Sequence, residues 1–393
     1  MRVVGVIAEY NPLHLGHAHH LAEARRLANA DAVVVVMSSA FTQRGDAAIL
    51  SPADRAKMAL SAGADAVFAL PAAWAVRDAE HFALGGVSIL AGLGCDAISF
   101  GTEDTDLPAL RSAAQLLEAP DEAFSADVRA RMEAGLPYPA ALSAAMDAVL
   151  PGCGALLEKP NSTLAVCYLR AMLRLHARMD VVPVQRLGSY HDSALGDALP
   201  SATALRGAIL RGDWTRVRAA MPEEAYRILR EAASSGRIHR PEALDSALLY
   251  RLRTMATADY AALPDISEGI ENRLRAAAES ARSREELLQS AKTRRYPYAR
   301  LSRLATHALL GMTDELLSGQ TAPEAAILLG FRREKRELFT HFKAHGALPI
   351  WGKAADFDRS ASWFAAECKA HDVWALGARL PAGLALTQGV AVI

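Results

Sequence analysis

Cysteine is scarce in this sequence, and the few cysteines follow no metal-binding spacing. The four cysteines among 393 residues lie far apart, and none forms a Cys-x-x-Cys motif. Isolated cysteines are typical of reduced, mostly buried thiols. We therefore expect a cytoplasmic protein without a disulfide framework. Its cysteines are Cys95, Cys153, Cys167 and Cys368.

Long apolar runs and an excess of one charge are also absent. No stretch approaches the ~18 uninterrupted apolar residues of a transmembrane helix. The apolar segment 1–7 is short and Glu9 follows closely, which indicates a strand rather than a signal peptide. Lysine and arginine number 43 against 44 aspartates and glutamates, a formal net charge of −1. A nucleic-acid surface would therefore be a local patch, and we expect neither a membrane nor DNA as a partner.

Short apolar, β-branched segments alternate with helical segments in the first half of the chain. Continuous apolar runs predict strands that are buried on both faces of a parallel sheet. The segments between them predict helices over 17–28, from Ser51 onward and over 78–93. This order predicts an α/β fold with a Rossmann-like, doubly wound parallel sheet. The expected strands span residues 3–8, 31–37, 66–70, 97–101 and 181–184.

The second half of the chain has a different pattern. After about residue 215 it is rich in Ala, Leu, Arg and Glu at helical spacing, as in residues 271–277. A chain of this length suits two domains, because one hydrophobic core usually stops growing at ~250–300 residues. We expect an α/β domain over residues 1–215 and a mainly α-helical domain over residues 216–393.

The most informative motif is His14-Leu15-Gly16-His17, between the first predicted strand and the first predicted helix. Ligands of parallel α/β sheets bind beyond the carboxyl ends of the strands, where a helix N-terminus attracts anions. Gly16 lets a nucleotide approach the backbone, and the two imidazoles can donate hydrogen bonds to a charged phosphoryl transition state. The motif therefore predicts a nucleotide site with His14 and His17 as catalytic residues.

Two other interpretations of this segment stay open at this stage. His14, His17, His19 and His20 are compatible with a metal cluster, although no acidic or cysteine partner stands at zinc spacing. Alternatively, the turn is purely structural. The phosphate loop GxxxxGK[ST] does not occur in the chain. We favour nucleotide binding, with no metal held by the protein itself and Mg²⁺ expected with ATP.

These residues resemble the HIGH-type nucleotidyltransferases, and the chain as a whole is more similar to one family, the tRNA(Met) cytidine acetate ligases. The resemblance runs over almost the whole length. It is carried by Gly5-Val6-Ile7-Ala8-Glu9-Tyr10-Asn11-Pro12, Gln43-Arg44-Gly45, Gly63-Ala64-Asp65, Phe100-Gly101-Thr102-Glu103, Lys159-Pro160-Asn161-Ser162, Ser201-Ala202-Thr203-Ala204-Leu205-Arg206, Ser267-Glu268-Gly269-Ile270-Glu271-Asn272-Arg273 and Lys292-Thr293-Arg294-Arg295-Tyr296.

The resemblance implies an ATP-dependent ligase. It would make acetyl-adenylate from acetate and ATP and would transfer the acetyl group to N4 of the wobble cytidine of elongator tRNA(Met), giving N4-acetylcytidine. Two alternatives are a nucleotidyltransferase that acts on a small coenzyme precursor and a tRNA-binding protein without catalytic activity. The long helical half argues against the first alternative, and the intact HxGH motif argues against the second.

The resemblance also implies two sets of site residues. For the ATP site we expect Ile7, Glu9, Tyr10, Asn11, His14, Gly16, His17, His20, Gly101, Asn161, Arg186 and Arg206. For tRNA contact we expect Lys292, Arg294, Arg295, Tyr296 and Arg300, because cations between aromatic rings suit phosphates and stacked bases.

Four of these residues have competing interpretations. Asn161 could be an ordinary helix cap, Arg186 a surface ion pair, and His20 a surface residue. Arg206 follows the helix-cap pattern Ser201-x-Thr203, which suits a phosphate at a helix start but also an ordinary capped helix. The basic run 332–336 is a second candidate for nucleic-acid contact.

Overall fold

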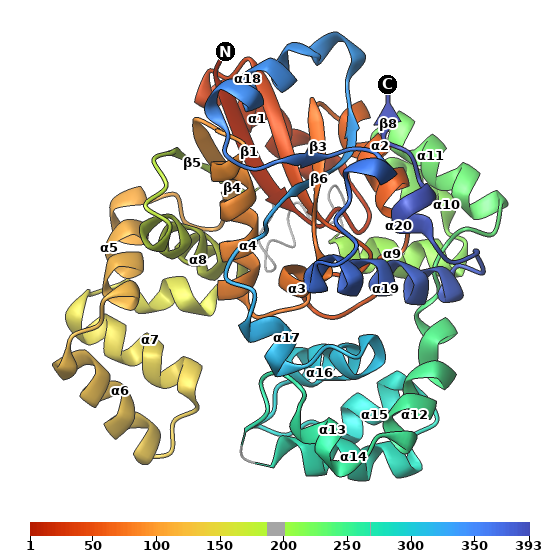
Figure 1. The fold of residues 1–393 in the computed structure, drawn as a ribbon. Helices are drawn as coiled ribbons and strands as arrows, with labels where there is room; N and C mark the ends of the chain where they lie inside the picture. Colours follow the sequence, from red (N-terminus) through yellow and green to blue (C-terminus); the bar gives the residue numbers. More distant parts are fainter. Residues whose placement is uncertain (187–200, 268) are drawn as a thin grey trace.

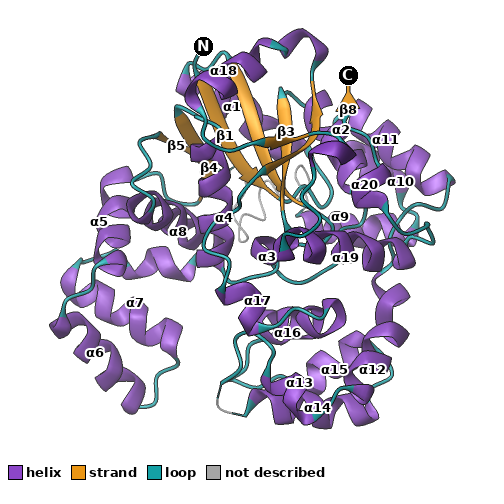
Figure 2. Ribbon diagram, viewed as in Figure 1, coloured by secondary structure: helices purple, strands orange, loops and turns teal. Residues whose placement is uncertain are grey.

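A computed structural model describes residues 1–186, 201–267 and 269–393 of the chain. Its centre is a mixed sheet with the strand order β5-β4-β1-β2-β3-β6-β7, and β8 pairs with β6 beside this path (Figures 1 and 2). The first five strands are mutually parallel, as expected. The strands are β1 (Val3–Ala8), β2 (Ala32–Ser38), β3 (Ala66–Leu70), β4 (Ala97–Thr102), β5 (Asp180–Gln185), β6 (Ala326–Phe331), β7 (Ile350–Trp351) and β8 (Ala391–Val392).

Helices surround this sheet and extend away from it (Figure 2). None of the described helices combines the length and hydrophobicity that a membrane crossing needs. The described helices are α1 (Leu15–Ala28), α2 (Pro52–Ser61), α3 (Ala72–Ala75), α4 (Ala79–Gly92), α5 (Leu107–Glu118), α6 (Glu122–Glu133), α7 (Tyr138–Val149), α8 (Pro160–Arg174), α9 (Ala202–Arg211), α10 (Trp214–Ala219), α11 (Glu223–Ser234), α12 (Asp245–Thr254), α13 (Thr257–Ala261), α14 (Ile270–Ser280), α15 (Arg284–Ala291), α16 (Tyr298–Leu310), α17 (Asp314–Ser318), α18 (Glu337–His345), α19 (Ser362–Gly377) and α20 (Leu384–Thr387).

The β-branched strands are buried on both faces, which explains their continuous apolar sequence. Alternate residues of β2 belong to different cores: Val34 and Val36 pack on the side of α4, and Val33 and Val35 pack on the side of α1 and α2. The predicted cap of α2 is present, because Ser51 Oγ accepts the N–H of Asp54 at 3.1 Å. The five predicted strands agree with the structure to within about a residue at each end.

The strand order has a switch point between β1 and β4, where a crevice is expected. β1 pairs with β2 on one side and with β4 on the other, so the connection after β1 runs toward β2 and the connection after β4 runs in the opposite direction, toward β5. At such a switch point the loops after the two strands separate and leave space for a ligand. The HxGH segment follows β1 and therefore lies at this crevice.

The C-terminal part of the chain contains strands that the sequence analysis did not predict. β6 pairs antiparallel with β3, and β7 and β8 pair with β6. The second half is mainly α-helical, as predicted, but residues 326–331 also extend the N-terminal sheet. Short segments at a sheet edge carry little periodic signal, so their sequence gives few signs of a strand.

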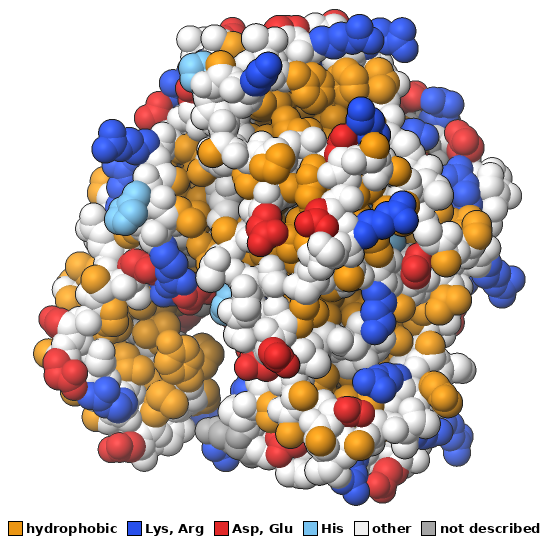
Figure 3. All heavy atoms as spheres, in the orientation of Figure 1, with side chains coloured by type: hydrophobic (Ala, Val, Ile, Leu, Met, Phe, Trp, Pro, Cys, Tyr) orange, Lys and Arg blue, Asp and Glu red, His pale blue; other side chains and the backbone are white. Residues whose placement is uncertain are grey.

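Two helical units project from the sheet layer (Figure 1). Helices α12 to α16 surround a separate apolar core that spans residues 248–308. The α6–α7 hairpin projects on the other side of the molecule, and hydrophobic side chains gather on it (Figure 3). Of these, Met132, Leu136, Tyr138 and Val149 are exposed. The boundary at residue 215 stays a prediction, and the separate helical core begins further along the chain.

Candidate nucleotide site

His14 and His17 form the centre of the site at the start of α1. His14 is the N-cap residue of the helix, and its Nδ1 accepts the N–H of Gly16 at 3.1 Å. The N–H of His14 in turn points at Nδ1 of His17, 3.3 Å away. The two rings stack with centroids 3.7 Å apart. This reciprocal cap holds both imidazoles in one orientation, as a capping box does with Ser and Glu.

The cap also determines where the two rings carry their protons. Burial, with a smaller effect of Arg186, lowers the pKa of His14 to about 4. Burial and then the neighbouring His14 lower the pKa of His17 well below its usual value. Both rings are therefore neutral at pH 7. Since each Nδ1 accepts a backbone N–H, we assign the proton of each ring to Nε2, where it can be donated to a phosphate oxygen.

The turn between β1 and α1 is held by buried contacts. Asn11 Oδ1 accepts the N–H of Ile49 at 2.8 Å, so this side chain orders the turn. Tyr10 is buried with a left-handed φ of 44°, and its ring meets His17 edge-on at 4.9 Å. Ile7 belongs to the core on the side of α4. The side chains of Ile7 and Tyr10 therefore support the site from the core.

Arg206 reaches this turn from α9. Its Nη1 donates to the backbone oxygen of Asn11 at 2.8 Å, and its Nη2 donates to Thr203 Oγ1 at 3.1 Å. Ser201 caps α9 by accepting the N–H of Ala204. The capped-helix interpretation is thus correct for Ser201, while Arg206 extends to the β1 turn. Burial lowers the pKa of the Arg206 guanidinium, which nevertheless stays charged at neutral pH.

Three predicted residues converge beyond β4 and β5. Arg186 Nη1 donates to Asn161 Oδ1 at 3.2 Å, and Asn161 Nδ2 donates to Glu103 Oε1 at 2.5 Å. A Cβ on Gly101 would lie 3.5 Å from Cγ of Arg186. Asn161 is not a helix cap, since α8 begins after Lys159 without a side-chain cap. Among the described residues Arg186 forms no carboxylate pair, and its side chain donates to Asn161 instead.

His20 is directed at the sheet rather than at solvent. Its Nε2 lies 3.2 Å from the Oγ of Ser99 in β4, and burial lowers its pKa to about 4. Arg186 is the second cause of this shift, and it also lowers the pKa of His14 and His17. The neutral imidazoles of His14, His17 and His20 therefore lie close enough to the Arg186 guanidinium to interact with it electrostatically.

A buried arginine that no sequence pattern points to holds the strand ends. Arg55 on α2 is fully buried and donates through Nη1 to the backbone oxygens of Glu9 at 2.7 Å and Ser38 at 2.9 Å. It also donates to the backbone oxygens of Ser39 and Leu50. One guanidinium thus joins the carboxyl ends of β1 and β2. A lone arginine in a helical segment gives no sequence signal for this role.

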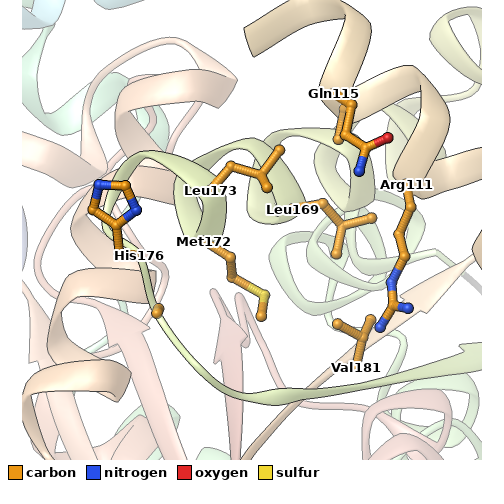
Figure 4. Close-up of a pocket in the computed structure, with 9 residues that line it drawn as sticks. Arg111, Gln115, Leu169, Met172, Leu173, His176 and Val181 are labelled. Carbon is orange, nitrogen blue, oxygen red and sulfur yellow. The ribbon is translucent and has the colours of Figure 1, made fainter. Parts of the chain in front are cut away.

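A metal cluster is not formed by the histidines of α1. Among the described residues there is no group of three or more His, Cys, Asp or Glu side chains that could hold a metal ion. A cavity of about 370 Å³ lies elsewhere, between α5, α8 and β5 (Figure 4). It is lined by residues such as Arg111, Leu169 and Val181 and by none of the predicted site residues.

Four of the predicted tRNA-contact residues lie between α15 and α16, and Arg300 lies in the first turn of α16. Lys292, Arg294 and Arg295 are exposed. Arg300 donates to the backbone oxygen of Asp265 at 2.6 Å and to Ser267 Oγ. Tyr296 is buried in the helical core, so its ring is not presented to solvent for stacking. Glu268 of the resembling motif lies outside the described residues.

The second basic run, residues 332–336, lies at the end of the sheet opposite the crevice. The N–H of Arg332 donates to the backbone oxygen of Asp65, and Lys335 Nζ donates to that of Asp31. Both acceptors precede the amino ends of their strands, β3 and β2. The crevice is at the carboxyl ends, so this run lies at the opposite end of the sheet.

The chain is similar to known proteins over most of its length. The family model of the HIGH nucleotidyl transferases matches residues 1–383. A tRNA(Met) cytidine acetate ligase of Acetivibrio thermocellus is 34% identical over 374 residues, which cover 92% of this chain and 90% of the relative. The protein of the same name from Bacillus subtilis is 33% identical and covers 92% and 89%.

Solved structures of a Thermotoga maritima protein are similar over the whole fold. The crystal structure of TmcAL bound with alpha-thio ATP superposes with a TM-score of 0.89 at 28% identity, covering 96% of this chain and 95% of the other. The apo structure gives a TM-score of 0.93 at 26% identity over the full length of both chains.

Proposed function

The chain belongs to the HIGH nucleotidyl transferases and, within them, to the tRNA(Met) cytidine acetate ligase family, and from this we propose that it activates acetate with ATP and acetylates a cytidine of elongator tRNA(Met). The observation that carries this proposal is the stacked pair of His14 and His17, whose Nε2–H groups are donors at the start of α1. The similar Thermotoga structure is bound with alpha-thio ATP, which supports binding of ATP by this fold.

In the first step an acetate oxygen attacks the α-phosphorus of ATP. The new O–P bond gives acetyl-adenylate, and pyrophosphate leaves with the electrons of the broken P–O bond. His14 and His17 donate hydrogen bonds to the phosphate oxygens, while Arg186 and Arg206 provide positive charge on either side. No covalent enzyme intermediate is needed, because positioning and electrostatic stabilisation suffice for such a displacement.

In the second step the N4 amine of the wobble cytidine attacks the acetyl carbonyl, AMP leaves, and N4-acetylcytidine is formed. The exposed side chains of Lys292, Arg294 and Arg295 are the best candidates for contacts with tRNA phosphates. Tyr296 would act by holding this loop in place, since it is buried. We further propose a cytoplasmic location, where ATP and tRNA are available.

Magnesium is expected to arrive with ATP. Mg²⁺ keeps several water ligands and often binds through the phosphates of its nucleotide. Its charge would neutralise the departing pyrophosphate. The chain's own contribution to this charge is the pair of guanidinium groups of Arg186 and Arg206.

One assay distinguishes the ligase from its alternatives. The protein is incubated with labelled acetate, ATP, Mg²⁺ and either elongator tRNA(Met) or tRNA whose wobble cytidine has been replaced. ATP-dependent label in the first tRNA alone supports the ligase. ATP–pyrophosphate exchange that needs another small substrate in place of acetate would support the coenzyme-precursor enzyme. Binding of tRNA without any exchange would leave a non-catalytic binding protein.

A further inference from the structure

We propose that Glu9 is the general base that removes the proton from the acceptor amine during acetyl transfer, an inference that rests on the ligase function above. Glu9 directly follows β1 and precedes the turn that leads to His14. The backbone oxygen of Glu9 is fixed by Arg55 at 2.7 Å. The residue is therefore rigidly held at the carboxyl end of the central strand, where the reacting groups meet.

The carboxylate of Glu9 has one oxygen bound and the other available. Its Oε1 accepts the N–H of Gln43 at 2.6 Å. No donor to Oε2 occurs among the residues that the structure describes. A carboxylate that is oriented through one oxygen and free at the other has the geometry a general base requires.

The surroundings of Glu9 make it a stronger base than an exposed glutamate. Burial raises its pKa, while the Gln43 N–H and the cations of Arg44 and Arg55 act in the opposite direction. Asp46 adds to the rise. Two further groups interact with the carboxylate from other helices: Arg206 on α9 and Tyr168 on α8. The cations oppose the effect of burial, and the net result is a raised pKa for Glu9.

The other ionisable groups around the crevice are already engaged. Glu103 accepts from Asn161 with Oε1 and from Ser162 with Oε2. Asp104 is paired with Lys159, and Asp46 is paired with Arg284 at 2.9 Å.

His14 and His17 cannot take the proton either. Nδ1 of His14 and of His17 accepts a backbone N–H, and Nε2 of each ring already carries a proton. Asp46 also has one oxygen without a donor among the described residues, but its other oxygen is paired with Arg284 of the helical unit, whereas Glu9 lies at the carboxyl end of the central strand.

The proposed step balances in atoms and charge. The amine nitrogen forms a bond to the acetyl carbon, and the bond from this carbon to the AMP oxygen breaks with its electron pair leaving on AMP. The proton of the amine moves to Oε2 of Glu9 and then passes to solvent. The lone pair of an exocyclic cytosine amine is delocalised into the ring, so removal of its proton in the transition state assists the attack.

The test compares Glu9→Gln with wild type in two assays. Glutamine keeps an oxygen for the Gln43 N–H but cannot accept a proton. Single-turnover acetyl transfer to tRNA should fall by ~10²–10⁴, the usual contribution of general base catalysis, and by a much larger factor than acetate-dependent ATP–pyrophosphate exchange. The transfer rate of wild type should rise with pH through one ionisation that E9Q lacks. A urea titration of E9Q checks that the variant has folded.

Two further variants complete the experiment. Glu9→Asp keeps a carboxylate on a shorter stem and should recover part of the transfer rate with its pH dependence. Glu23→Gln, on the exposed face of α1, makes the same chemical change away from the site and should leave both assays unchanged. An equal loss of exchange and transfer in E9Q, unchanged transfer in E9Q, or an E9D variant no faster than E9Q would each overturn the assignment. Wild-type protein that exchanges pyrophosphate without acetylating tRNA would overturn the ligase function and this inference together.

Discussion

At the scale of single residues, the feature that matters most is that His14 serves the helix and the chemistry at once. Its Nδ1 caps α1, and this contact is what directs the proton of the ring to Nε2. An imidazole that accepts a backbone N–H is therefore both a stabilising cap and a donor to phosphate. Loss of the ring should remove both functions, and the two can be separated by a suitable substitution.

We predict that His14→Ala and His14→Asn differ in stability but not in activity. Asn is a favourable N-cap and Ala is not, so His14→Ala should lose ~0.5–2 kcal/mol in the free energy of unfolding, which Asn restores. Neither variant can donate from the position of Nε2, and acetate-dependent exchange should fall by ~10²–10³ in both. Urea titration and exchange assays measure the two effects. Normal exchange in H14N, or loss of tRNA binding in either variant, would contradict the assigned role.

At the scale of elements, the loop 42–46 joins the nucleotide site to the helical unit. Gln43 donates to Glu9 at one end, and Arg284 pairs with Asp46 at the other. Between them, Gly45 O accepts the hydroxyl of Thr306 at 2.6 Å, and Ser302 Oγ donates to Arg44 O. Through this one loop the end of β1 is held to α15 and α16.

Gly45 of this loop has no room for a larger side chain. It has a φ of +81°, and a Cβ there would lie 2.8 Å from the backbone oxygen of Ser302. We predict that Gly45→Ala lowers the free energy of unfolding by ~2–4 kcal/mol, of which ~1–2 is left-handed strain. The matched control is Gly236→Ala, with a φ of +68° and open space around its Cβ. Equal losses in urea titrations of the two variants would show that the contact with Ser302 contributes nothing.

At the scale of the whole molecule, the sheet gathers segments from both ends of the chain. β6 to β8 extend the sheet beyond β3, while α12 to α16 form their own core. Consequently the two basic segments lie apart: residues 292–295 precede α16 in the helical unit, and residues 332–336 follow β6 at the sheet. Only the first belongs to the helical unit that the loop 42–46 holds beside the nucleotide site.

This separation gives a prediction for tRNA binding. The double variant Lys292→Ala/Arg294→Ala should weaken binding of tRNA and lower the salt dependence of the binding constant by ~0.7–0.9 per lost phosphate contact. Acetate-dependent exchange should not change. The control Lys335→Ala/Arg336→Ala removes the same charge at the other end of the sheet. Filter-binding titrations at several salt concentrations test this, and equal effects of the two pairs would contradict it.

The buried histidines predict how stability depends on pH. Burial lowers the pKa of His14, His20, His239 and His307 to about 4. Between pH ~6.5 and ~4 the unfolded chain binds more protons at these sites, so the free energy of unfolding falls as the pH is lowered. The loss should reach ~1–3 kcal/mol per histidine.

His307 offers the clearest single test of this dependence. It is fully buried beside the backbone oxygen of Val76. His307→Gln keeps a donor for this oxygen but removes the titrating ring. Urea titrations at pH 7 and pH 5 should show a smaller difference for this variant than for wild type. A difference as large as that of wild type would show that His307 does not contribute.

The sequence by itself determined the parallel strands and the position of the HxGH motif, because these depend on local patterns. Buried strands need continuous apolar residues, and a motif directly after a strand must lie at its carboxyl end. The meeting of Arg186, Asn161 and Gly101, the buried position of Arg55 and Tyr296, and the joining of β6 to β3 were decided by tertiary structure. These contacts join residues far apart along the chain, so which partner each residue meets depends on how the packed elements lie against one another.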